Sequence, residues 1–80
     1  MIQVLFFGPV AERIGKRQID VDFHPGLRWQ DIYGELRAHH HEAFALVSVV
    51  AVNGKRVDEQ DDTLLTDGAE VVFMSAFSGG

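Results

Sequence analysis

The first segments of the chain alternate apolar and polar side chains with the period of two that is typical of a β-strand. In the stretch IQVLFF, residues 2–7, every second side chain is apolar, and Leu5 and Phe7 make the opposite side apolar as well. The stretch RQIDVDF, residues 17–23, alternates in the same way, with acidic residues on its polar side. A Gly-Pro pair and a short helical turn closed by Gly15 separate the two strands, so we expect them to form a hairpin.

Residues 29–44 place apolar side chains at steps of three and four, which is the spacing of one amphipathic helix. The next stretch, LVSVVAV at residues 46–52, is β-branched and nearly all apolar, a composition typical of a central strand. It is followed by Asn53-Gly54, a dipeptide that favours a tight hairpin turn. We therefore expect a brief partner strand at Arg56-Val57.

A last strand is expected over residues 70–74, after a turn at Asp67-Gly68. The complete order is strand, strand, helix, strand, short strand and strand. This order predicts an α+β domain of the ubiquitin-like β-grasp class, in which one main helix packs on a mixed sheet of four to five strands. We place this domain at residues 1–74 and interpret residues 75–80 as a flexible diglycine tail.

A single helix can cover only one face of the predicted sheet. The alternation places Leu5, Phe7, Val72 and Met74 on the other face, at the ends of the first and last strands. A few scattered apolar residues are common on the surface of monomers. These four side chains are close enough in the predicted sheet to form one patch, so we interpret the uncovered face as a docking surface for a second chain.

Composition and charge narrow the classes of partner. The 80 residues are 46% hydrophobic, which suits one small globular domain. The formal net charge of −5 argues against nucleic acid and against an anionic membrane surface, because both need clustered Lys and Arg. The chain has no cysteine, hence no thiol nucleophile or thiolate metal site, which fits a cytoplasmic protein. The short apolar segment at residues 1–7 lacks a signal-peptide pattern, so we interpret it as a strand.

Side chains with obvious catalytic or metal-binding potential do not form a site in this sequence. His39, His40 and His41 are adjacent, so on a helix they point about 100° apart and cannot converge on a metal as ligands at i and i+4 do. They are better explained by helix capping and packing. Asp61 and Asp62 belong to an acidic, solvated loop, and no serine has a recognisable base partner. We expect no metal and no catalytic side chain.

The last residues offer a different chemistry. Residues 75–80 can extend on the order of 20 Å beyond the last strand, far enough to enter a pocket of another protein. Gly79 and Gly80 lack a Cβ, so they can pass a narrow channel. A free α-carboxylate on Gly80 is a weak electrophile, but a nucleotide phosphate converts it into a mixed anhydride that a sulfur nucleophile can attack. The Gly80 carboxylate is therefore a candidate site for carrying sulfur.

Four segments together resemble a known family over essentially the whole length of the chain. They are IQVLFFGPVAERIG, VAVNGKRV, TLLTDGAEV and the closing SGG. Their combination resembles the small subunit of molybdopterin synthase, a β-grasp sulfur carrier related to ubiquitin. The resemblance implies that a ubiquitin-activating-like adenylyltransferase uses ATP to activate Gly80, which a persulfide donor then converts into a thiocarboxylate.

The same resemblance implies a division of labour between two proteins. The tail would insert into the large synthase subunit, within a heterotetramer, and donate sulfur to cyclic pyranopterin monophosphate in a two-component sulfurtransferase. Phe7 and Met74 match positions that dock the partners, and Phe77 would enter the partner channel. Relatives often have two prolines in place of Ser75-Ala76 and an aliphatic residue in place of Phe77, so we expect a more flexible tail here.

Two alternatives use the same tail chemistry. A β-grasp sulfur carrier can serve thiamine synthesis, tRNA thiolation or amino-acid synthesis instead of molybdopterin synthesis. A ubiquitin-like modifier or protein-binding module would direct the diglycine to lysine amines. The stretch VLFFGPVAERIG and the 80-residue length resemble the molybdopterin branch more than the shorter thiamine one.

Overall fold

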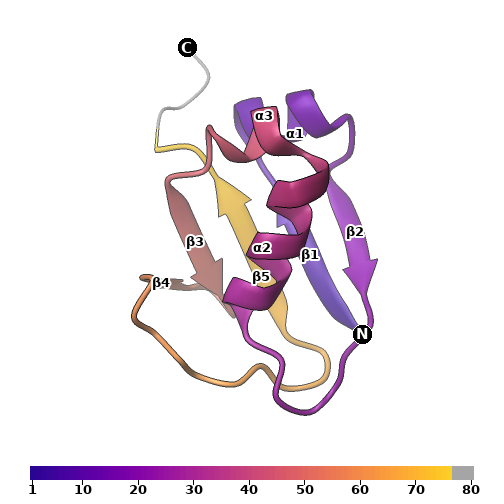
Figure 1. Cartoon of the computed structure of the whole chain (residues 1–80), viewed down its shortest axis with the longest axis vertical. Coiled ribbons are helices and arrows are strands. Elements are labelled where there is room, and N and C mark those ends of the chain that lie inside the picture. Colours follow the sequence, from indigo (N-terminus) through magenta and orange to yellow (C-terminus); the bar gives the residue numbers. More distant parts are fainter. Residues whose placement is uncertain (77–80) are drawn as a thin grey trace.

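The computed structural model describes residues 1–76, and within them one five-stranded mixed sheet forms the centre of the domain (Figure 1). The strands are β1 (Ile2–Phe6), β2 (Gln18–Val21), β3 (Val49–Val52), β4 (Lys55–Val57) and β5 (Glu70–Met74). Their order across the sheet is β2-β1-β5-β3-β4, and only the central pair of β1 and β5 runs parallel. The predicted β-grasp class, with its mixed sheet, is confirmed.

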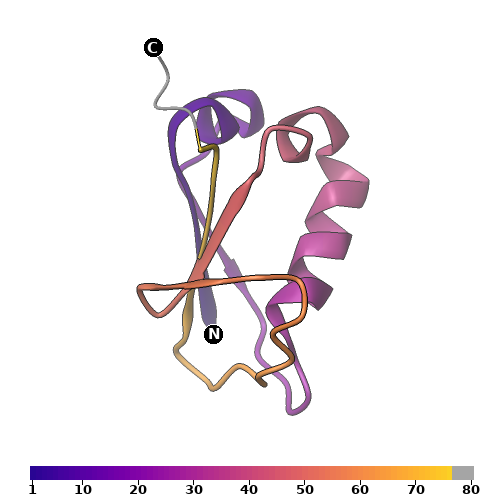
Figure 2. The ribbon, with the colours of Figure 1, turned by 90° about the vertical axis from the view of Figure 1, so that its left-hand side faces the viewer.

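Three helices lie on or beside this sheet. They are α1 (Gly8–Ile14), α2 (Trp29–His39) and α3 (His41–Phe44). Figure 2 shows the sheet nearly edge-on, with α2 along one face and α1 at the end where β1 stops. Within residues 1–76 no helix covers the other face, as the sequence predicted.

The prediction of one unbroken helix over residues 29–44 is wrong. The helix is interrupted at His40, whose φ and ψ of −132° and 55° are not helical. In a straight helix Tyr33 and Phe44 would be separated by about 16 Å along the axis. Their ring centroids lie only 5.5 Å apart. The break folds α3 back so that Phe44 joins the core, and the energy of burying this ring outweighs helix continuity.

The two turns that the sequence predicted by dipeptide are present. Asn53 and Gly54 have φ values of 51° and 80°, as a tight turn between β3 and β4 requires. The side-chain Oδ1 of Asn53 also accepts a hydrogen bond of 2.9 Å from the amide of Glu70. This contact ties the hairpin to the start of β5 and fixes the register at that end of the sheet.

A cluster of aromatic rings fills the space between α2, α3 and the sheet. The ring centroids of Phe44 and Phe73 are 5.1 Å apart, and Phe6 and Tyr33 complete the cluster at 6.3 and 6.0 Å from Phe73. Phe6, Phe44 and Phe73 are essentially inaccessible to solvent. Because alternate residues of β1 and β5 enter this core, their other side chains must lie on the face without helices.

Candidate docking face and tail exit

The face without helices carries a cross-strand row of apolar side chains through its centre. Strand register places Leu5 opposite Val72, Val72 opposite Ala51, and Ala51 opposite Arg56. These residues alternate with the core residues of their strands, so the row faces away from α2. Ala51 was not among the residues predicted for this face, although the almost uniformly apolar stretch around it indicates a strand that is apolar on both sides.

A second apolar row lies nearer the end of the sheet where β5 stops. Met74 is paired with Val49, and Phe7 follows β1 with its amide donating a 3.3 Å hydrogen bond to the Phe73 carbonyl. Phe7 is 51% exposed, and Leu5 and Met74 are half-buried. Val72 lies in the middle strand of the sheet, between Leu5 and Ala51, and is only 6% exposed. We call the residues Leu5, Phe7, Val49, Ala51, Val72 and Met74 the apolar patch.

The apolar patch ends toward the opposite end of the strands. Gln3 is paired with Glu70 on one side and with Asp20 on the other, and this row lies on the same face one step beyond Leu5 and Val72. The face therefore changes from polar to apolar in the direction of the last residues of β5. The apolar part of the face thus lies at the end of the sheet where the described chain leaves β5.

Ser48 guides the chain as it leaves the sheet. Its amide donates a 3.0 Å hydrogen bond to the carbonyl of Met74, and its Oγ accepts one of 2.6 Å from the amide of Ala76. Sequence reasoning missed Ser48, since a serine in an otherwise apolar stretch gives no signal of its distant partner. The predicted tail residues Phe77, Gly79 and Gly80 lie outside the described residues.

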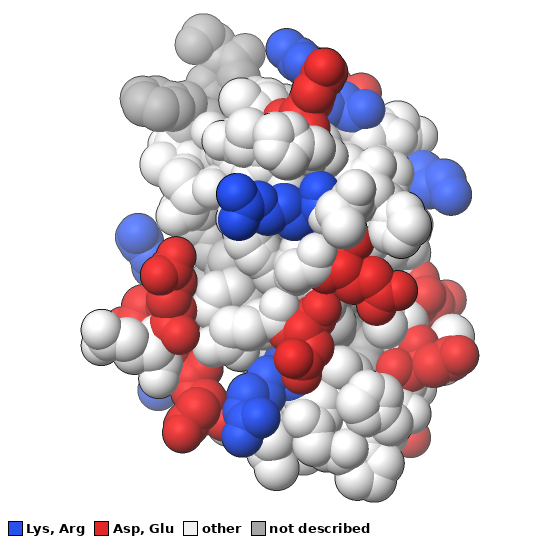
Figure 3. Space-filling view, viewed as in Figure 1, with Lys and Arg blue, Asp and Glu red and all other residues white. Residues whose placement is uncertain are grey.

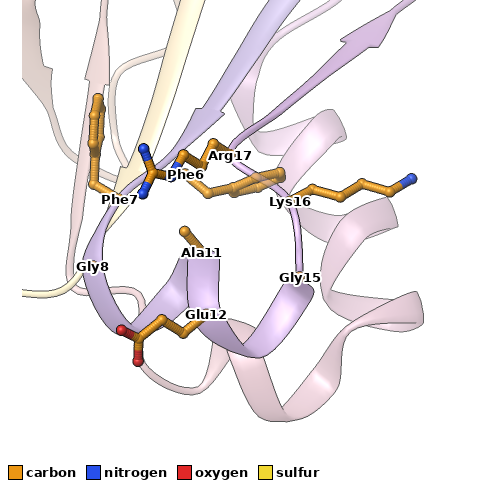
Figure 4. A pocket seen from close by; sticks show the side chains of 8 residues that line it. All are labelled: Phe6, Phe7, Gly8, Ala11, Glu12, Gly15, Lys16 and Arg17. Atoms are coloured by element: carbon orange, nitrogen blue, oxygen red, sulfur yellow. The ribbon is translucent and has the colours of Figure 1, made fainter.

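A hollow of about 520 Å³ lies beside Phe7, between α1 and the turn that leads to β2 (Figure 4). Its lining includes Ala11 and Glu12 of α1 together with Lys16 and Arg17. Figure 4 shows the aromatic ring of Phe7 at one side of this hollow and the guanidinium of Arg17 above its centre. The end of the sheet near the tail exit thus combines an exposed aromatic ring with positive charge, although the whole chain is acidic.

In the loop after β4, hydrogen bonds from the hydroxyl and amide of Thr63 hold the pKa of the Asp61 carboxyl below its usual range. Asp61 is therefore ionised at neutral pH. Among residues 1–76 no group of His, Cys, Asp or Glu is arranged to hold a metal ion. No helix in the same residues is long and apolar enough to cross a membrane.

The sequence pattern of the ThiS family matches residues 4–80, which is nearly the whole chain. The chain belongs to the ThiS family. The residues matched by the ThiS-family pattern include those of the apolar patch and the tail residues that follow Ala76. No curated protein matches the sequence.

Solved structures show the fold that this ThiS-family protein shares. A protein of Pyrococcus furiosus described as molybdopterin converting factor subunit 1 aligns with a TM-score of 0.76 at 24% identity, over 92% of this chain and 94% of its own. SAMP1 of Haloferax volcanii aligns with a TM-score of 0.77 at 21% identity, over 99% and 98%. A chain in the protein-protein complex of subunits 1 and 2 of molybdopterin-converting factor from Helicobacter pylori 26695 aligns with a TM-score of 0.66 at 22% identity. The alignment covers 99% of this chain and 97% of that one. The chain thus shares the β-grasp fold of these proteins.

Proposed function

We propose that this protein is a sulfur carrier in molybdenum cofactor biosynthesis, in which a thiocarboxylate on Gly80 donates sulfur to cyclic pyranopterin monophosphate. The observation that carries the proposal is the position of the apolar patch. Two of its members, the exposed Phe7 and the half-buried Met74, lie where β1 and β5 end, beside the point at which Ser48 directs the chain off the sheet. A partner docked there receives the tail that follows Ala76.

The sulfur chemistry requires activation that this chain does not supply. A ubiquitin-activating-like adenylyltransferase would join the Gly80 carboxylate to AMP from ATP, with release of pyrophosphate. A persulfide donor would attack the acyl carbon, form an acyl disulfide and release AMP. A thiol would then reduce the disulfide and leave the thiocarboxylate. Because the chain has no cysteine, the sulfur and the reducing thiol come from partners.

The proposed acceptor site belongs to a large subunit of molybdopterin synthase. The complex of subunits 1 and 2 of molybdopterin-converting factor in Helicobacter pylori, whose structure contains a chain with this fold, supports such a partner. A closed site would exclude water, which otherwise hydrolyses the thiocarboxylate. A dithiolene contains two sulfur atoms, so the synthesis of one product molecule requires two carrier molecules that each bear a thiocarboxylate.

A second candidate function is protein modification. The specific observation in its favour is the fold shared with SAMP1, a small archaeal modifier protein, over nearly the full length of both chains. In this alternative the activated Gly80 would be transferred to a lysine amine, not to a sulfur acceptor. Sulfur delivery to thiamine or tRNA is a third outcome that the ThiS-family match supports at the level of the family.

The acceptor of the sulfur distinguishes these functions. The protein is charged with ATP, an activating enzyme and a persulfide donor, and its intact mass should rise by the difference between one sulfur and one oxygen. The charged protein is then mixed with a molybdopterin synthase large subunit and cyclic pyranopterin monophosphate. We expect the carboxylate mass to return as a dithiolene product appears. Discharge only into a thiazole precursor, into tRNA or onto protein lysines would refute the molybdopterin assignment.

The proposed docking face leads to a prediction for arginine substitutions. Phe7→Arg and Met74→Arg should each weaken binding to the large subunit by about tenfold or more, because an unpaired charge would be buried in the complex. Both side chains are at least partly exposed in the free protein, so their replacement should change its stability little. Isothermal titration calorimetry measures the affinity, and urea unfolding measures the stability.

Leu64 provides a matched control for these variants. It is 50% exposed, nearly the same as Phe7, but it belongs to the loop between β4 and β5 and not to the apolar patch. Leu64→Arg makes the same chemical change at a different place and should leave the affinity unchanged. Equal affinities for Leu64→Arg and Phe7→Arg would show that the partner does not dock on this face.

A further inference from the structure

β2 forms one edge of the sheet, and no strand of residues 1–76 pairs with its outer backbone groups (Figure 1). The amide of Phe6 donates a 2.9 Å hydrogen bond to the carbonyl of Arg17, so the backbone of Arg17 points toward β1. Backbone groups of successive residues in a strand alternate in direction. The amides and carbonyls of Gln18 and Asp20 therefore point away from β1, along the free edge.

A groove of about 470 Å³ runs beside this edge, between β2 and α2. Its floor is apolar and is formed by core-facing side chains of both elements, including Ile19, Val21, Ile32 and Leu36. An additional strand on β2 would place every second side chain over this floor. The groove therefore has the two parts that strand addition requires, a row of open backbone groups and an apolar surface beside it.

The charge around the groove favours one class of occupant. Asp20 and Asp22 flank the edge, and Asp31 and Glu35 lie one helical turn apart on α2. His24 is the single basic side chain that lines the groove, and no Lys or Arg lines it. Figure 3 shows acidic side chains over α2 and along the β2 side of the molecule, with Lys or Arg side chains among them.

We propose that this groove binds an extended segment of a partner protein in which apolar residues alternate with Lys or Arg. The segment would add as a sixth strand along β2, with its apolar side chains over Ile19 and Ile32 and its basic side chains on the opposite face, beside Asp20 and Asp22. This surface lies along β2, on the side of β1 that faces away from β5. Binding there makes no use of Gly80.

A second copy of this chain does not fit the same edge. Pairing two β2 strands would bring Asp20 and Asp22 of both copies together, and like charges on paired strands destabilise each other. The net charge of −5 adds a general repulsion between copies. A basic segment removes this repulsion.

The test uses the full chain and a short synthetic peptide that alternates lysine with valine. NMR titration should shift resonances of β2 and α2, and the outward amides of Gln18 and Asp20 should become protected from solvent exchange. A peptide with glutamate in place of lysine should not bind. Binding should weaken as salt rises, because the pairing charges are exposed. Shifts confined to the apolar patch, or dimerisation of the protein in sedimentation, would overturn the proposal.

Two pairs of variants separate backbone pairing from charge. Asp20→Pro removes the outward amide as well as the charge, whereas Asp20→Asn removes the charge alone, so the proline variant should bind the peptide about tenfold more weakly than the asparagine variant. Glu35→Lys should weaken binding several-fold, while Glu59→Lys, which makes the same charge change outside the groove, should not. Equal affinities within both pairs would mean that the acidic residues only protect the edge from aggregation.

A tail variant separates this inference from the proposed function. Deletion of Gly79 and Gly80 should leave peptide binding at the groove unchanged. If the peptide binds and sulfur transfer fails, only the sulfur-carrier proposal is wrong. If sulfur transfer succeeds and the peptide does not bind, only the groove proposal is wrong.

Discussion

Deletion of Gly79 and Gly80 is expected to abolish sulfur transfer in an extract that lacks its own carrier. The reacting carbon in the proposed mechanism is the Gly80 carboxyl carbon. Removing two residues draws the carboxylate back by about 7 Å, whereas displacement by about 1 Å can already cost a hundredfold in rate. We therefore expect a loss of at least about a thousandfold, measured as the rate of molybdopterin formation with the large subunit and the activating enzyme present.

The same deletion should not change the stability of the domain. Every buried residue of the described core precedes the deleted glycines, so the thermal midpoint should stay the same. Ser78→Ala is the matched control, because it alters the tail and keeps both glycines. If the truncated protein still supports molybdopterin synthesis, the assignment of Gly80 as the residue that carries sulfur is wrong.

The faces of the sheet could be read from the sequence because a strand has only two of them. The alternation in residues 2–7 placed Phe6 in the core and Leu5 and Phe7 opposite it, and the structure has the same arrangement. Once the first and last strands are central neighbours, Val72 and Met74 must join Leu5 on one surface. Short-range rules also identified the Asn53-Gly54 turn, since few residues tolerate positive φ at successive positions.

Features that depend on distant parts of the chain were beyond this reasoning. Helical periodicity continues through His40, and only the position of Phe44 against Tyr33 and the sheet shows that the helix must break there. Val72 is nearly buried in the middle strand, between Leu5 and Ala51, and alternation within one strand does not reveal which strands will be its neighbours. The role of Ser48 at the tail exit likewise depends on a hydrogen bond to a residue far along the chain.

Replacement of Phe73 by alanine is expected to destabilise the domain by about 3–5 kcal/mol. Phe73 is 0% exposed, and its ring lies at the centre of the cluster formed with Phe6, Tyr33 and Phe44. The shortened side chain leaves a cavity that the surrounding rings cannot fill without breaking their packing on the sheet. Domains of this kind have only about 5–15 kcal/mol of total stability, so the variant should be partly unfolded well below the urea midpoint of the parent protein.

Phe7→Ala removes the same atoms one residue beyond β1 and is the control for this prediction. Because Phe7 is 51% exposed on the face without helices, its loss leaves no enclosed cavity and should change the unfolding free energy by less than about 1 kcal/mol. The two phenylalanines should therefore have opposite effects on stability and binding, with Phe73 needed for the fold and Phe7 for docking. If Phe7→Ala unfolds as easily as Phe73→Ala, the patch side chain contributes to the core of the domain, and its assignment as a free docking residue is wrong.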